Sequence, residues 1–171
     1  MEQLIFLTGF MGVGKTTTGK RLANSLSIDF IDTDEMIEKK YSCSIVEYFE
    51  NYGESSFRKE ERAILLDIIK SNNQAVISVG GGLPCYNDNM EFMNQNGTTV
   101  YLQRPSKELF HRLLQGRHKR PLIARMSDDE LLNFIESKLQ EREKFYLLAE
   151  IIADRDQQEP SELIELIEAK S

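Results

Sequence analysis

A glycine-rich segment near the start of the chain restricts its possible folds more than any other feature. Residues Gly9–Thr16 read Gly-Phe-Met-Gly-Val-Gly-Lys-Thr and match the pattern G-x-x-x-x-G-K-[ST] at every specified position. A β-prone run, Gln3–Thr8, precedes this segment, and Lys15–Leu26 follows it with apolar residues at helical spacing. A strand, a glycine loop and a helix in this order predict a phosphate-binding loop (P-loop), whose backbone N–H groups surround an anion at the helix N-terminus.

The P-loop residues predict a nucleotide site that holds phosphates and Mg²⁺. In this motif the lysine, here Lys15, reaches the β- and γ-phosphates, and the hydroxyl of Thr16 can bind Mg²⁺. A glycine-rich turn that matches the pattern by chance is the alternative, but its position between a strand and an amphipathic helix argues against it. Switches, motors and kinases all contain a P-loop, so the remaining residues decide between these classes.

Short apolar runs alternate with longer amphipathic runs along the chain, which predicts a parallel β-sheet covered by helices on both faces. The expected strands are 3–8, 30–31, 75–79, 98–102 and 151–153, and the expected helices are 15–26, 35–41, 45–52, 54–71, 106–114, about 128–148 and 161–169. Ser106, and either Ser127 or Asp128, are expected to cap the helices that begin near them. Ligands of such sheets bind beyond the carboxyl ends of the strands, where the P-loop, residues 32–34 and residues 80–82 all fall.

Length and charge limit the class of protein further. The length of 171 residues, without a repeat or a linker-like stretch, predicts one domain over residues 1–171. The net charge of −7 argues against nucleic-acid binding, whereas Arg104–Arg125 holds seven Lys/Arg against one acid and suits a small anion such as ATP. No run approaches the roughly 20 apolar residues needed to span a bilayer, no heptad pattern stands out, and Cys43 and Cys85 are isolated. We therefore expect a cytoplasmic monomer with reduced thiols and no membrane partner.

Two carboxylates follow the second expected strand. Asp32 and Asp34 are two residues apart, so their side chains can share one face. One carboxylate beside the P-loop can position Mg²⁺ or its waters, and the other can orient an attacking hydroxyl or accept its proton. The alternative is a helix cap, because Asp34 directly precedes a helical run. Spacing alone leaves both interpretations open.

Three further segments carry candidate substrate-binding residues. Arg58 and Glu61 lie three residues apart on an expected helix, so Glu61 can hold the Arg58 guanidinium for a substrate carboxylate, although a solvated charged face is the alternative. Gly80–Gly82 ends a β-prone run, and three consecutive glycines indicate backbone that approaches a ligand closely. The basic loop 116–122 either closes over transferring phosphates, with Arg120 stabilising their charge, or simply connects two helices.

Together these segments resemble the shikimate kinase family over nearly the whole chain. The discriminating features, in order, are Asp32-Thr33-Asp34, Phe57-Arg58, the Gly80–Gly82 run, Arg120-Pro121-Leu122, and Arg142 with Tyr146. The resemblance implies a three-layer αβα P-loop kinase fold with a five-stranded parallel sheet, a lid at about 113–126 and a substrate-binding helical segment at about 33–61. It also implies ATP-dependent phosphorylation of the 3-hydroxyl of shikimate.

The resemblance further implies a role for each matching residue. ATP phosphates would bind Gly12, Val13, Gly14, Lys15, Thr16, Thr17 and Arg120, with Mg²⁺ held by Thr16 and Asp32 directly or through water. Shikimate would bind Asp34, Arg58, Gly80, Gly81, Gly82 and Arg142, the two arginines gripping its carboxylate. The catalytic set would be Lys15, Asp34 and Arg120, with Asp34 as the candidate base and the two cations stabilising the transferring phosphoryl group.

The chain departs from the family pattern in two places. Relatives often carry Arg-x-Pro-Leu-Tyr, whereas residues 142–146 read Arg-Glu-Lys-Phe-Tyr, so Arg142 could instead be an ordinary residue of a long helix. Around residues 154–158 the adenine contact is ambiguous.

Two other functions also remain open. A kinase for gluconate or a nucleoside monophosphate would share the P-loop and the lid, although a nucleotide acceptor suits Asp34 poorly. A non-catalytic ATP-binding module would be expected to lose Lys15, Asp34, Arg58 and Arg120, all of which are present.

Overall fold

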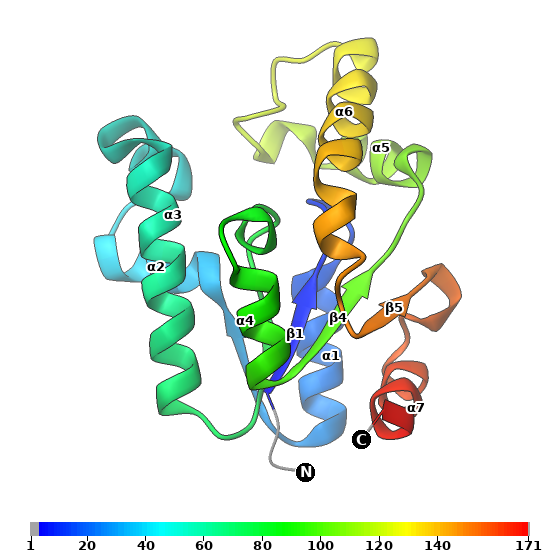
Figure 1. Ribbon diagram of the computed structural model, residues 1–171. Coiled ribbons are helices and arrows are strands. Elements are labelled where there is room, and N and C mark those ends of the chain that lie inside the picture. Colours follow the sequence, from blue (N-terminus) through cyan, green and yellow to red (C-terminus); the bar gives the residue numbers. More distant parts are fainter. Residues whose placement is uncertain (1–3, 171) are drawn as a thin grey trace.

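A computed structural model describes residues 4–170 and confirms the α/β fold (Figure 1). Five parallel strands form one sheet in the order β2-β3-β1-β4-β5. The strands are β1 (Leu4–Thr8), β2 (Asp29–Asp32), β3 (Ala75–Ser78), β4 (Thr98–Leu102) and β5 (Ile151–Ala153). The helices are α1 (Lys15–Leu26), α2 (Thr33–Tyr41), α3 (Ile45–Ser71), α4 (Asn89–Asn96), α5 (Ser106–Gln115), α6 (Asp128–Tyr146) and α7 (Pro160–Lys170), with short 3₁₀ helices η1 (Leu83–Cys85), η2 (Arg117–Lys119) and η3 (Arg155–Gln157).

The three central strands, β1, β3 and β4, are buried on both faces of the sheet. Side chains alternate along β1, so Ile5 and Leu7 belong to one hydrophobic core and Leu4 and Phe6 to the other. Helices α1, α5 and α7 and the first half of α6 pack into the first core, and α3 and α4 pack into the second. Burial on both faces explains why these strands are continuous apolar runs, and it produces the expected three αβα layers.

The register of the sheet brings the chemically active loops together. Strand β3 lies between β2 and β1, with Ser78 paired to both Asp32 and Leu7, and Thr8 pairs with Tyr101 of β4. All five strands are parallel, so their carboxyl ends meet at one edge of the sheet. The P-loop after β1, the acidic segment at the end of β2 and the glycine run after β3 therefore leave the sheet side by side.

Helix α3 contains the two expected helices, 45–52 and 54–71, joined by a kink at Gly53. The backbone of Gly53 has φ 77° and ψ 169°, far from helical values. This region of backbone space is essentially restricted to glycine. Ser44 caps the start of the helix and exchanges hydrogen bonds with Glu47, which forms a capping box.

Three expected helix ends need correction. The N-cap of α2 is Asp32, not Asp34, because the Asp34 N–H donates to the Asp32 Oδ1. Ser106 is the first helical residue of α5, and Pro105 occupies the cap position. Ser127 caps α6 as expected, but the helix ends at Tyr146, two residues before the expected end.

Other differences are small. Helix α4 and the 3₁₀ helices were not expected from the apolar pattern, which is weak over these short polar stretches. The expected start of β1 at residue 3 lies outside the described residues. Cys43 and Cys85 are both free thiols. Within residues 4–170, no helix combines the length and the apolar character needed to cross a membrane.

Candidate active site

The P-loop connects β1 to α1 through backbone that glycine favours. Gly12 and Gly14 have φ values of 78° and 108°, which side-chain-bearing residues rarely adopt. The Lys15 ammonium folds back over the loop and donates to the carbonyl oxygens of Gly9 at 2.7 Å and Phe10 at 3.2 Å. These two contacts hold the lysine at the mouth of the loop, where an incoming phosphate would meet it.

A cavity of about 540 Å³ opens at the carboxyl edge of the sheet and extends from the P-loop to α3 and α6. Its volume lies within the range of small-molecule sites. The predicted residues that line it are Gly12, Gly14, Lys15, Thr16, Thr17, Asp32, Asp34, Arg58, Gly80, Gly81, Gly82, Arg120 and Arg142. Val13 does not line it. Its side chain is buried in the core, so it could offer a ligand only its backbone.

Asp32 is fixed by both of its carboxylate oxygens. The Thr16 hydroxyl donates to Asp32 Oδ2 at 2.9 Å, and the Asp34 N–H donates to Oδ1 at 3.0 Å. The Thr33 hydroxyl accepts a hydrogen bond from the Gly80 N–H at 3.1 Å, which ties the same segment to the glycine run. A hydroxyl and a carboxylate beside a P-loop form the kind of oxygen donor set that Mg²⁺ prefers.

Asp34 and Lys15 face each other in a mostly buried environment. Burial raises the pKa of Asp34 to about 6, the nearby Asp32 adds to the rise, and Lys15 opposes it. Burial lowers the pKa of Lys15 to about 8, against the opposing effect of the two aspartates. Asp34 Oδ1 is buried and has no hydrogen-bond partner within the described residues. An unpaired buried oxygen costs stability, so this atom is suited to accept a hydrogen bond from a ligand.

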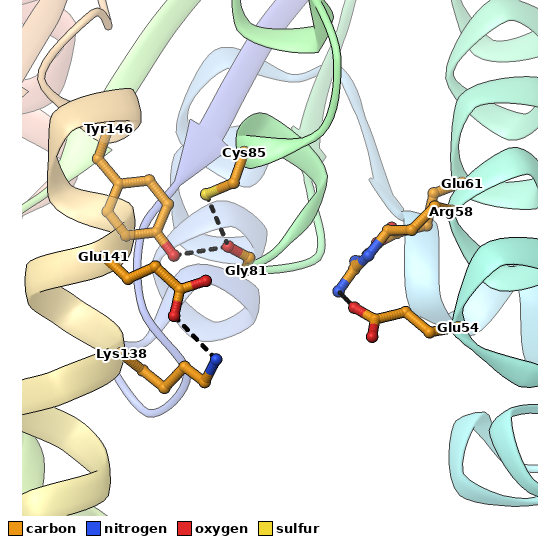
Figure 2. Close-up of polar contacts among 8 residues, drawn as sticks. All are labelled: Glu54, Arg58, Glu61, Gly81, Cys85, Lys138, Glu141 and Tyr146. Atoms are coloured by element: carbon orange, nitrogen blue, oxygen red, sulfur yellow. Dashed lines mark hydrogen bonds and ion pairs between the residues drawn. The ribbon is translucent and has the colours of Figure 1, made fainter.

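Arg58 is held on α3 by two carboxylates (Figure 2). One guanidinium nitrogen donates to Glu61 Oε2 at 2.6 Å, and the other terminal nitrogen contacts Glu54 Oε1 at 3.3 Å. Glu61 is only 1% exposed. Burial raises the pKa of Glu61 to about 7, and the Arg58 guanidinium limits the rise. The expected pairing of Arg58 with Glu61 is therefore present, and it is not a solvated surface contact.

The glycine run packs directly against these charged groups. A Cβ atom on Gly80 would lie 2.6 Å from Glu61 Oε1 and 3.0 Å from Asp34 Oδ1. A Cβ atom on Gly82 would lie 2.5 Å from a guanidinium nitrogen of Arg58. Neither glycine has a positive φ, so a side chain at either position would not strain the backbone but would have to displace Glu61, Asp34 or Arg58.

Arg142 reaches the cavity from α6, on the side opposite Arg58. Its guanidinium carbon lies 6.0 Å from the centre of the Phe10 ring, within cation–π range. A Cβ atom on Gly81 would lie 3.5 Å from one of its terminal nitrogens. Arg142 is therefore part of the cavity wall and not an ordinary surface residue of α6.

The basic segment Arg104–Arg125 contributes two arginines. Arg120 lines the cavity and donates to the Gly116 carbonyl at 3.2 Å. Arg112, which the sequence argument left out of the site, also lines the cavity and donates to the Gly12 carbonyl of the P-loop at 2.7 Å. The sequence signal that could have identified Arg112 as a site residue is its position within the basic segment Arg104–Arg125.

Sequence reasoning also missed the apolar part of the cavity wall. Ile45, Phe49 and Phe57 line it from α3, and Leu122 lines it from the segment between α5 and α6. Phe49 and Phe57 are in ring contact, with centroids 4.4 Å apart. Only Phe57, the neighbour of Arg58, stood next to a recognisable signal. Ile45, Phe49 and Leu122 carry no such signal in the sequence.

The cavity joins the P-loop to a second compartment lined by acids, arginines and exposed backbone. A switch or a motor needs no such acceptor site, so the arrangement defines a P-loop kinase that acts on small molecules. The family model for shikimate kinase matches residues 11–170. The chain therefore belongs to the shikimate kinase family.

Individual relatives agree with this assignment. A shikimate kinase from Bacteroides fragilis is 47% identical over 161 residues, which cover 94% of this chain and 89% of the relative. The crystal structure of shikimate kinase from Bacteroides thetaiotaomicron matches with a TM-score of 0.90 and 42% identity, over 98% of this chain and 97% of that one. Shikimate kinase from Acinetobacter baumannii, solved in complex with shikimate, matches with a TM-score of 0.84 and 31% identity, over 99% and 94%.

Proposed function

We propose that the chain transfers the γ-phosphate of ATP to the 3-hydroxyl of shikimate and releases shikimate 3-phosphate and ADP. The observation that carries the proposal is the single cavity in which a P-loop meets Asp34, Arg58, Arg142 and the glycine run. Membership of the shikimate kinase family supports the same reaction.

The donor half of the cavity would bind the triphosphate of ATP. The N–H groups of residues 12–17 and the N-terminus of α1 would surround the phosphates, and Lys15 would leave its carbonyl contacts for the β- and γ-oxygens. Thr16 and Asp32 would hold Mg²⁺, which neutralises phosphate charge when bound. The 2.9 Å contact between their oxygens supports this pairing.

The acceptor half would recognise shikimate by charge and by hydroxyl position. Its carboxylate would lie between Arg58 and Arg142, which line the cavity from α3 and α6. Arg58 enters this role with its guanidinium already oriented by Glu61. The unpaired Asp34 Oδ1 would accept a hydrogen bond from a substrate hydroxyl, and the backbone of Gly80–Gly82 would contact the ring closely.

The transfer step would form one bond and break another at the γ-phosphorus. The 3-hydroxyl oxygen of shikimate bonds to phosphorus as the bond to the β,γ-bridging oxygen breaks, and ADP leaves with that electron pair. Asp34 would take the hydroxyl proton, a role that its raised pKa of about 6 favours over an ordinary aspartate. Lys15 and Arg120 would stabilise the charge on the transferring group.

We propose that residues 1–171 form one domain, in which one segment binds the acceptor and another closes over it. Residues 33–61, which include α2 and the kinked part of α3, would hold the acceptor. Residues 113–126, which carry Arg120 and Leu122 into the cavity wall, would close over it as a lid.

We also propose a cytoplasmic monomer that binds ATP and shikimate without a nucleic-acid or membrane partner. The two free thiols support a reducing compartment.

The test is ADP release from Mg-ATP in the presence of shikimate, gluconate or AMP. We expect release with shikimate alone. Turnover with gluconate or AMP but not with shikimate would contradict the assignment of Arg58 and Arg142 to an acceptor carboxylate. No turnover with any acceptor, from folded protein that binds ATP, would instead favour a non-catalytic ATP-binding module.

A further inference from the structure

The hydroxyl of Tyr146 makes a short hydrogen bond to the glycine run. It donates to the Gly81 carbonyl oxygen at 2.6 Å, from the last turn of α6 (Figure 2). The side chain of Tyr146 is fully buried, and its ring lies against Tyr101 with centroids 5.1 Å apart. Burial raises the pKa of the Tyr146 phenol far above its usual range, so the hydroxyl keeps its proton and remains a donor.

Tyr146 and Arg142 occupy the same face of α6, because they are four residues apart on one helix. Both converge on Gly81: a Cβ atom there would lie 3.5 Å from Arg142 and 3.6 Å from the Tyr146 hydroxyl. Helix α6 continues unbroken through Tyr146. The geometry that relates Arg142 to the glycine run is therefore set by a regular helix and by the Tyr146 hydroxyl, which interacts with both the Gly81 carbonyl and the Arg142 side chain.

The hydrogen bond also orients a peptide group. The peptide bonds of the described residues are all trans, so the Gly82 N–H points away from the Gly81 carbonyl. The Gly81 carbonyl faces Tyr146 of α6 (Figure 2), so the Gly82 N–H points away from α6. Within residues 4–170, this N–H donates to no protein acceptor. It is available to a ligand in the acceptor half of the cavity, which Gly82 lines.

The Cys85 thiol is the other group near this carbonyl, 4.0 Å from the oxygen. Burial raises the pKa of Cys85 to about 11, so it is present as a thiol, which is a weak donor. The position of the Gly81 carbonyl therefore depends mainly on Tyr146.

We propose that Tyr146 is a positioning residue for the acceptor substrate: its hydroxyl fixes the Gly81–Gly82 peptide and holds the end of α6, and with it Arg142, at the correct distance from that peptide. Tyr146 itself does not line the cavity. The inference rests on the proposed function, because it assigns the acceptor half of the cavity to shikimate.

The experiment compares Tyr146→Phe with the unaltered enzyme. The substitution removes one oxygen atom and keeps the ring against Tyr101. We expect the KM for shikimate to rise about three- to ten-fold, the range for losing one neutral hydrogen bond, while the KM for ATP and kcat change less than two-fold. Tyr101→Phe is the matched control. It removes a hydroxyl from the other ring of the same buried pair, one that makes no hydrogen bond to the glycine run among the described residues, and it should leave all three constants unchanged.

A second measurement does not depend on turnover. In the ligand-free protein, Tyr146→Phe should shift the Gly82 amide ¹⁵N resonance, because that nitrogen shares a peptide group with the hydrogen-bonded carbonyl. Tyr101→Phe should not shift it. Two outcomes would assign the hydroxyl to stability alone and overturn the proposal. One is a lower melting temperature of Tyr146→Phe with an unchanged shikimate KM and an unchanged Gly82 resonance. The other is a Tyr146→Phe chain that does not fold. Failure of the unaltered enzyme to phosphorylate shikimate would instead overturn the proposed function.

Discussion

Asp34 shows how one residue combines a requirement for function with a cost to stability. One of its oxygens is buried without a partner, and its neighbours at the site are Asp32, Lys15 and the packed glycine run. The folded protein binds a proton on this carboxyl more tightly than the unfolded chain does, because burial raises the pKa from 3.8 to about 6. Stability associated with this group is therefore present below pH 4 and is lost as the pH rises through about 6.

Replacing Asp34 with asparagine should reveal this cost. Asparagine carries no charge, so the free energy of unfolding of Asp34→Asn at pH 8, measured by urea titration, should exceed that of the unaltered protein by about 3 kcal/mol. The difference should shrink toward pH 4.5. The same variant should lose phosphoryl transfer. Asp29→Asn is a suitable control, because Asp29 is exposed at the start of β2. A stability difference that is constant with pH would show that Asp34 is not desolvated as described.

Arg58 supports a prediction about affinity. It is largely buried and paired with Glu61, so a carboxylate that binds it would do so with little competition from water. Arg58→Ala should weaken shikimate binding, measured by calorimetry, by about 2–5 kcal/mol. Arg62→Ala removes the same charge one turn later, where the side chain contacts Asn89 outside the cavity. Equal shikimate affinity in the Arg58 and Arg62 variants would remove Arg58 from the acceptor site.

At the scale of an element, the kink in α3 depends on a single residue. Gly53 has backbone angles that other residues avoid, yet a Cβ atom placed there would meet no other atom within 4 Å. The kink turns the first two turns of α3, which carry Ile45 and Phe49, relative to the part that carries Phe57 and Arg58. The orientation of one cavity wall is thus set by local backbone conformation.

Gly53→Ala should therefore cost stability through backbone strain alone. We expect the free energy of unfolding to fall by about 1–3 kcal/mol in urea titrations. Ser55→Ala, two residues later on an exposed helical position, should change it by less than about 0.5 kcal/mol. Equal stability of the two variants would mean that the kink relaxes without strain and that Gly53 does not determine it.

The elements also show where prediction from sequence succeeds. The five strands and the major helices were predicted because each combines a strong apolar period with a recognisable start, such as the P-loop before α1. Helix α4 was missed because Asn89–Asn96 is short and polar. Asp34 was weighed as a cap although Asp32 takes that role, a choice that depends on the Thr16 hydroxyl from another element. Ile45, Phe49 and Leu122 carry no local mark of a cavity wall, because only the tertiary fold brings them there.

At the scale of the whole molecule, the cavity joins parts of the chain that are distant in sequence. Its walls come from the P-loop, α3, the glycine run, the segment after α5, and α6. A ligand that binds there contacts both hydrophobic cores indirectly, through helices that pack into each of them. Binding should therefore stabilise the entire fold against unfolding.

Shikimate at 100 times its dissociation constant should raise the free energy of unfolding by about 2.7 kcal/mol. For a chain of this size that corresponds to a rise of roughly 5–10 °C in melting temperature, measured by calorimetry. Gluconate at the same concentration should produce no comparable rise, and Arg58→Ala should reduce the effect of shikimate to about a third or less. A shift of unreduced size in Arg58→Ala would place the bound shikimate somewhere other than the proposed site.

The crowding around Gly80 and Gly82 has a consequence for inhibition. Any side chain at these positions would collide with Asp34, Glu61 or Arg58, which the proposed reaction needs in place. A compound that hydrogen-bonds to the backbone of Gly80–Gly82 would contact positions at which a substitution would displace residues that the proposed reaction needs. Resistance by point mutation would then have to arise elsewhere in the cavity, and the apolar wall formed by Ile45, Phe49 and Leu122 offers the most freedom for it.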